Sequence, residues 1–157
     1  MKKLGVKIGS TDSNVQDSGG STPITPPILS YLAGILDGEG SIMLTRQKSK
    51  SLRSPSLSVT SIDEELIEWL LTNFGGIKVK KKKYRKNHAQ AWEWRLRNKL
   101  KLFDLLKNVL PYIVIERKRQ KIVYLLENYD KVTQRNGKYT EEMLNKKLSF
   151  EKNFLDI

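Results

Sequence analysis

Apolar and polar residues follow two different periods along the chain, and the changes of period divide it into elements. Pro26 and Pro27 suit the first turn of a helix, and the apolar residues over 28–36 then recur at helical spacing. Glycines at 38 and 40 end this helix. Residues 41–50 and 52–60 alternate between apolar and polar, which predicts two strands joined by a short turn.

The same order then repeats with different residues. Asp63 is a suitable N-cap for a second helix, which the glycine pair 75–76 stops. Residues 77–84 and 89–97 predict a second hairpin, and helical patterns follow near 99–110, 115–129 and 140–155. Two hairpins separated by helices predict an α+β fold with an antiparallel sheet whose one face the helices cover.

The second predicted hairpin separates apolar from charged residues by parity. Ile77 and Val79 alternate with lysines, and the tryptophans of 89–97 alternate with charged residues. We therefore expect one apolar face and one face dense in cations. Lysines also protect exposed edge strands from pairing with other chains, but that role accounts for only a few of them.

Composition narrows the class of protein. The 157 residues carry 29 Lys and Arg against 17 Asp and Glu, a net charge of +12, which favours a polyanion such as nucleic acid as the partner. A basic soluble protein, or one adapted to heat, is the alternative. Cysteine is absent, which excludes disulfides and thiolate chemistry, and no apolar run is long enough to cross a membrane. We expect an intracellular protein with a flexible Ser-, Gly- and Pro-rich leader over 1–27 and a single domain over 28–157.

Residues 32–40 read LAGILDGEG, at the end of the first predicted helix and directly before a strand. This segment resembles the signature of the LAGLIDADG homing endonucleases, and EWLLTNFGG at 68–76 and LPYIVIERKRQ at 110–120 are similar to further family segments. The resemblance covers roughly residues 28–130. It implies the αββαββα fold of that family, a saddle-like antiparallel sheet with helices on one face, and metal-dependent hydrolysis of DNA.

The resemblance also implies roles for single residues. Glu39 matches the acidic metal ligand, assisted by the backbone carbonyl of Gly38, and would hold Mg²⁺, with Ca²⁺ or Mn²⁺ able to occupy the same site. Asp37 matches the acid that packs and caps helices. Ser61 stands where the family often carries a water-positioning Gln. Glu116 stands where the family has a basic residue, so the neighbouring Arg117 or Lys118 is the expected substitute.

One motif supplies one carboxylate, whereas cutting both strands of a duplex needs two. The family pattern therefore implies a homodimer in which the motif helices cross at Ala33, Gly34 and Asp37, bound to a long pseudo-palindromic duplex target. Strand by strand, the family pattern places the following residues against DNA: Met43, Thr45, Gln47, Ser54, Ser56, Ser58, Lys78, Lys80, Lys82, Glu93, Arg95 and Arg97. Among these, Gln47, Arg95 and Arg97 are the expected base-reading residues, because Gln pairs with adenine and Arg with guanine.

Two other functions fit the same fold. The chain could be an RNA maturase that assists the splicing of an intron, or a DNA-binding regulator without catalysis. The retained acid at Glu39 favours the endonuclease, encoded within an intron or intein, because a pure binder does not need a carboxylate that faces phosphate. The departures at Ser61 and Glu116 favour the other two functions weakly.

Overall fold

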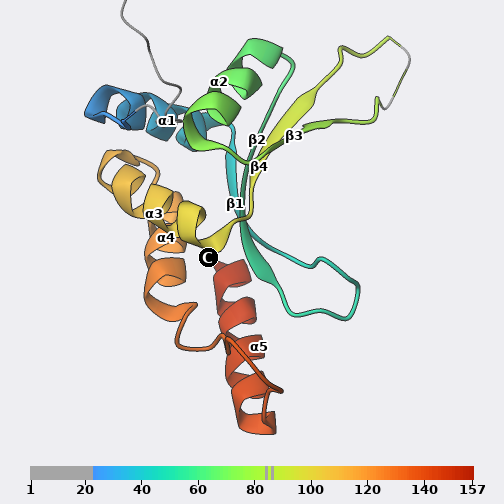
Figure 1. The fold of residues 1–157 in the computed structure, drawn as a ribbon, viewed down its shortest axis with the longest axis vertical. Coiled ribbons are helices and arrows are strands. Elements are labelled where there is room, and N and C mark those ends of the chain that lie inside the picture. The colour runs from blue at the N-terminus through green and yellow to red at the C-terminus, as the bar shows by residue number, and fades with distance from the viewer. Residues whose placement is uncertain (1–22, 84, 86) are drawn as a thin grey trace, which may run out of the picture.

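The computed structural model describes residues 23–83, 85 and 87–157 (Figure 1). The elements in chain order are α1 (Pro26–Gly38), β1 (Gly40–Thr45), β2 (Ser54–Ser61), α2 (Glu64–Phe74), β3 (Ile77–Lys80), β4 (Trp92–Leu96), α3 (Lys99–Val109), the 3₁₀ turn η1 (Leu110–Tyr112), α4 (Glu116–Asn128) and α5 (Glu141–Asp156). Positions 1–22 of the predicted leader lie outside the described residues, and α1 begins at Pro26.

The four strands form one antiparallel sheet in the order β1-β2-β4-β3, so β2 and β4 are central and β1 and β3 are edges. Figure 1 shows the helices gathered on one side of the sheet, while the loops of both hairpins extend away from them. The predicted α+β fold with the order αββαββα is confirmed.

The core lies between the sheet and the helices. Leu32 and Leu36 of α1 pack in one buried cluster with Leu57 and Val59 of β2 and with Trp94 of β4. Trp94 is fully buried, and its indole nitrogen donates to the carbonyl oxygen of Gly75 at 2.7 Å. Because a buried indole N–H needs a partner, this bond also fixes the turn that leads from α2 into β3.

The corner between α1 and β1 requires glycine. A Cβ on Gly40 would lie 2.6 Å from the Cα of Leu36, a distance too short for two carbon atoms that are not bonded. The chain can therefore turn from α1 directly into β1, with one residue, Glu39, between them. This tight turn sets the position of Glu39 at the rim of the sheet.

The strands are shorter than predicted, so the expected bounds 41–50, 77–84 and 89–97 are wrong at the loop ends. In the first hairpin, local bonds replace strand pairing: the Ser51 hydroxyl donates to the carbonyl of Lys48 and accepts from its backbone N–H. Gln47, Lys82 and Arg97 consequently lie in loops beyond the ends of β1, β3 and β4.

Candidate active site and nucleic-acid interface

Glu39 is the C-cap residue of α1, and its backbone N–H donates to the carbonyl of Ile35 at 2.8 Å. Its side chain is exposed, and no residue in the described part of the chain bonds or ion-pairs with its carboxylate. A free carboxylate at the negative end of a helix dipole is electrostatically unfavourable by itself. Such a group is well suited to accept a cation.

Asp37, two residues earlier, is occupied by the protein. Its Oδ2 accepts from the backbone N–H of Val114 at 2.8 Å, and its Oδ1 accepts from that of Ile115 at 3.2 Å. Ile115 is the N-cap residue of α4, so the carboxylate satisfies N–H groups at the start of that helix. Asp37 therefore ties α4 to the end of α1, while Glu39 stays free.

Lys118 brings a positive charge to the same helix end. From the first turn of α4, its ammonium donates to the carbonyl oxygens of Leu36 and Asp37, the latter at 2.7 Å. Burial lowers the pKa of Lys118 and the positive charge of Arg117 adds to this, while the carboxylates of Asp37 and Glu39 oppose it; the net shift is downward. Of the two basic residues predicted here, Lys118 lies at the end of α1, and Arg117 is exposed on α4.

Ser61 and Glu116 are engaged elsewhere. The Ser61 hydroxyl accepts from the backbone N–H of Asp63 at 3.0 Å, in the turn that precedes α2. Glu116 accepts from Gln120 at 3.2 Å and pairs with Arg119 at 3.9 Å, both on its own helix. Neither side chain bonds to Glu39, so the free carboxylate and Lys118 are what the structure brings together.

The face of the sheet opposite the helices is defined by the strand register, and we call it the open face. Met43 is opposite Ser56, Thr45 is opposite Ser54, and Arg95 is opposite Ser58. These residues alternate with the core residues of the same strands, so they lie on the predicted face. Ser56 and Ser58 are nevertheless buried, at 1% and 6% exposure. They lie beneath the surface of this face. Their hydroxyls are therefore not accessible in this chain for the direct contact with bases that the family pattern implied.

The predicted orientation of β3 is wrong. Lys78 is opposite Trp94 and Lys80 is opposite Trp92, so both lysines point to the helix side, and Ile77 and Val79 share the open face with Arg95 and Glu93. Lys78 ion-pairs with Glu64 at 2.8 Å and with Glu68, both on α2, and the hydrogen bonds that its ammonium donates to these carboxylates raise its pKa. Both lysines also lie over the Trp92 ring.

The physical reason is that β3 is a short edge strand. A lysine on the helix side of an edge strand reaches solvent at the rim while its aliphatic stem covers an aromatic ring. The alternation of lysines with apolar residues in β3 therefore did not indicate which face of the sheet the lysines lie on. Parity instead places Lys81 on the open face, where its ammonium bonds to Glu93 at 2.8 Å. Sequence reasoning missed Lys81, although continuing the spacing of Ile77 and Val79 leads to it.

The motif helix exposes a different set of small residues from the predicted one. Ala33 is 1% exposed and packs in the chain's own core, so its predicted place between two subunits is wrong. Gly34 and Gly38 are exposed, and a Cβ on either would meet nothing within 4 Å. Tyr31 on α1 and Val114 beside it are exposed apolar residues. The exposed surface of α1 is therefore partly apolar and has no side chain at Gly34 and Gly38.

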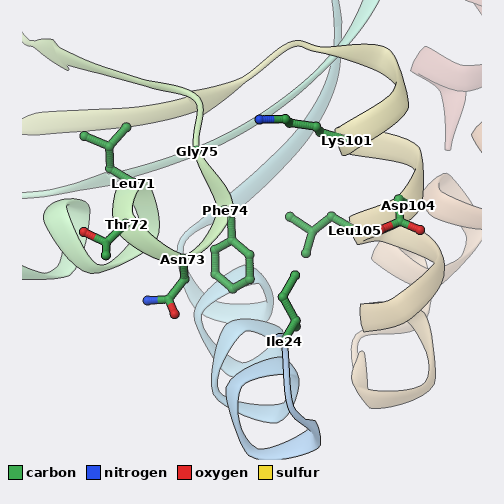
Figure 2. A pocket seen from close by; sticks show the side chains of 9 residues that line it. All are labelled: Ile24, Leu71, Thr72, Asn73, Phe74, Gly75, Lys101, Asp104 and Leu105. Carbon is green, nitrogen blue, oxygen red and sulfur yellow. The ribbon is translucent and has the colours of Figure 1, made fainter. Parts of the chain in front are cut away.

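A hollow of about 390 Å³ lies between the end of α2 and helix α3. Figure 2 shows side chains that line it, among them Ile24, Phe74 and Lys101. It contains neither Glu39 nor Lys118. Among the described residues, no three His, Asp or Glu side chains gather into a metal cluster, and no described helix is long and apolar enough to span a membrane.

The helix end that carries Asp37 and Glu39 belongs to a sequence segment that a known family shares. A family model described as LAGLIDADG endonuclease matches residues 32–129, more than half of the sequence. The chain belongs to the LAGLIDADG endonuclease family, and the resemblance seen in the motif is confirmed. A comparison with curated proteins found no match.

Solved structures with the same fold are homing endonucleases. I-SmaMI, bound to an uncleaved DNA target with calcium ions, has a TM-score of 0.60 and 24% identity over 82% of this chain and 45% of its own. I-TnaI has a TM-score of 0.58 and 19% identity, covering 82% of this chain and 95% of its own. I-CvuI, in complex with its target and calcium, has a TM-score of 0.56 and 17% identity over 80% of this chain and 78% of its own.

Proposed function

We propose that this chain is a site-specific endonuclease of duplex DNA that acts as a homodimer and depends on a divalent cation. The observation that carries the proposal is the contrast between two neighbouring acids. Asp37 is bonded to the start of α4, whereas Glu39 is exposed and unbonded among the described residues, with the Lys118 ammonium at the same helix end. A structural acid is paired; an acid kept free beside a lysine is available for chemistry.

The chemistry of this helix end fits Mg²⁺. Magnesium prefers carboxylate and carbonyl oxygens and keeps several ligands from water and phosphate. The Glu39 carboxylate and the backbone carbonyl of Gly38 are the proposed ligands, since carbonyls in the last turn of a helix have no partner within it. A bound cation would polarise the scissile phosphate and neutralise its developing charge. Lys118 holds a positive charge close by, which would stabilise the negative charge that develops on the phosphate during hydrolysis.

A second copy of the chain would complete the site. One chain offers one free carboxylate at this place, and its described residues contain no metal cluster. The exposed surface of α1 at Gly34 and Gly38 allows two helices to approach closely, because neither residue has a side chain there. In such a twofold dimer the two Glu39 residues would lie side by side, and each would serve one strand of a pseudo-palindromic target.

The open face is the proposed DNA-reading surface. Met43, Thr45 and Arg95 lie on this face, with Lys81 just after the end of β3. Neighbouring β-strands can read base edges in a major groove, and the net charge of +12 favours a polyanion. Gln47 and Arg97, in the loops that follow β1 and β4, would extend this surface. The lysines would contact phosphates, which sets affinity and not sequence preference.

The direct experiment combines the purified chain with DNA from its host locus, in Mg²⁺, in Mn²⁺, in Ca²⁺ and in EDTA. We expect cleavage of both strands at one position in Mg²⁺ and none in EDTA, together with a dimer in sedimentation. Specific binding without cleavage in Mg²⁺ or Mn²⁺ would instead assign the chain as a DNA-binding regulator. Tight binding to the intron RNA with no cleavage of the locus would assign it as a maturase.

A further inference from the structure

Glu93 lies in the middle of the open face, on central strand β4, and is one of the few buried charged residues, at 4% exposure. The register places it opposite Thr60 of β2 and Val79 of β3. A buried carboxylate is costly unless it is paired and hydrogen-bonded. Its position on a DNA-reading surface is unexpected, because a negative charge there repels phosphates.

Both oxygens of the Glu93 carboxylate are used within the protein. Oε1 accepts from Nε and Nη2 of Arg95, at 2.9 and 2.6 Å, and Oε2 accepts from Nζ of Lys81 at 2.8 Å. Burial raises the pKa of Glu93, but the hydrogen bonds from Lys81 and Arg95 outweigh this and lower it. Glu93 is therefore ionised, and both of its oxygens are already bonded within the protein. A carboxylate that is bonded in this way and 4% exposed is poorly placed to accept from a cytosine.

The bonds to Glu93 leave one edge of Arg95 free. The guanidinium has two donor edges, and the Nε–Nη2 edge is the one that faces Glu93. No other described residue bonds to Arg95, and its side chain is 24% exposed. The remaining donors, on Nη1 and Nη2, form the parallel pair that matches O6 and N7 of guanine. Across the sheet, Arg95 is opposite Ser58, a short side chain that is itself buried.

We propose that Glu93 is a positioning residue for sequence recognition: it holds Arg95 so that the free edge of the guanidinium reads one guanine in the major groove. The inference rests on the proposed DNA-binding function and replaces the expectation that Glu93 contacts DNA directly. Arg side chains lose much conformational freedom when they bind. An Arg held in place beforehand gives a larger difference between the right and the wrong base.

Lys81 has a different part in this arrangement. Its ammonium bonds to the other oxygen of Glu93 and is about half exposed, so it adds positive charge at the rim. The group of one carboxylate and two cations keeps a net positive charge towards DNA. Lys81 therefore contributes to affinity for any sequence, and Arg95 to preference at one base pair.

The test measures base preference by binding, so it needs no cleavage. Genomic fragments of the source organism are selected on the full-length protein in Ca²⁺, and the selected site is then varied one base pair at a time. Arg95→Ala should abolish a preference for guanine at one base pair of each half-site, a loss of about tenfold or more. Glu93→Gln should reduce the same preference by about two- to tenfold, the range expected for immobilising one side chain.

Matched variants separate the possible causes. Glu68→Gln removes the same charge from the helix side of the sheet and should change no base preference. Glu93→Gln added to Arg95→Ala should have no further effect at that base pair, because the two residues act as one unit. Lys81→Ala should lower the affinity for all DNA sequences alike. Melting temperatures confirm that each variant is folded.

Three outcomes would overturn the inference alone while leaving the proposed function intact. In the first, Glu93→Gln changes preference at a cytosine, even with Arg95→Ala, so Glu93 reads that base itself. In the second, Glu93→Gln raises the affinity for every DNA sequence equally, so the carboxylate acts only by repelling phosphates. In the third, Arg95→Ala changes no single base pair, so Arg95 grips phosphate. If the parent protein selects no duplex sequence, the proposed function and this inference both fail.

Discussion

Asp37 fastens the end of α1 to the start of α4, and Asp37→Asn measures what this link contributes. The carboxylate accepts two backbone N–H bonds, at 2.8 and 3.2 Å. Hydrogen bonds to a charged group stabilise by about 1.5–3 kcal/mol each, against about 1 for neutral ones. The amide of Asn has one acceptor oxygen, so one bond is lost and the other loses its charge. Since both bonds are exposed to solvent, the low end of this range applies, and we expect a destabilisation of about 2 kcal/mol.

Urea unfolding followed by far-UV circular dichroism provides the measurement. With a slope of about 2 kcal/mol/M, a loss of about 2 kcal/mol moves the midpoint by about 1 M, with an unchanged slope. Glu39→Gln is the matched control, because it removes the same charge two residues away from a carboxylate without bonds. It should leave the midpoint unchanged or raise it slightly, since an anion at a helix C-terminus is unfavourable. A loss below about 0.5 kcal/mol for Asp37→Asn, or equal losses for both variants, would refute the reasoning.

Three further predictions concern the dimer, the basic residue of the site and pH. Gly34→Leu should give a folded monomer in sedimentation, because a Cβ there meets nothing within 4 Å in one chain whereas the side chain would separate two packed helices. A dimer that still cuts would contradict the proposed interface. Lys118→Met should lower DNA cleavage about 100-fold or more while changing DNA affinity less than threefold, the pattern of a group that acts on the transition state; an equal loss of both would make Lys118 a simple phosphate contact. Burial lowers the pKa of Lys147 to about 8, although the negative charges of Glu151 and Asp130 oppose this shift. Between about pH 8 and 10.5 the unfolded chain therefore binds more protons than the folded one, and the free energy of unfolding should rise with pH. Lys147→Met should flatten this rise, and an identical rise in the parent and the variant would contradict the reasoning.

The elements and their order followed from the sequence because local signals agreed with the fold. Pro26 and Pro27 begin α1, and Gly75 and Gly76 end α2 with positive φ angles of 68° and 94°, which glycine adopts readily. The motif at 32–40 carried the family assignment. These signals are short-range, so a single sequence contains them in full.

Features that depend on contacts between distant segments could not be predicted in the same way. The side of Lys78 and Lys80 was set by Glu64 and Glu68 on α2 and by the ring of Trp92, not by the alternation within β3. Glu64 and Glu68 lie four residues apart on α2, and this spacing was the one signal in the sequence for a basic partner such as Lys78.

The same limit explains the other corrections. Ala33 packs in its own core because it lies on the buried side of α1 with Leu32 and Leu36, while Gly34 lies on the free side. The choice between Arg117 and Lys118 needed the packing of α4 against the end of α1, which the Asp37 bonds determine. A single sequence does not show how α4 packs against the end of α1.

The central claim is that the free carboxylate of Glu39 serves the hydrolysis of DNA and not its binding. One measurement tests it: the parent and Glu39→Gln are compared on the same host-locus duplex by gel shift in Ca²⁺ and by nicking and double-strand cleavage in Mg²⁺. The account predicts that Glu39→Gln binds as tightly as the parent or tighter, because a negative charge near phosphate is removed, while its cleavage falls by about 100-fold or more. Cleavage by Glu39→Gln at the parent's rate would contradict the account.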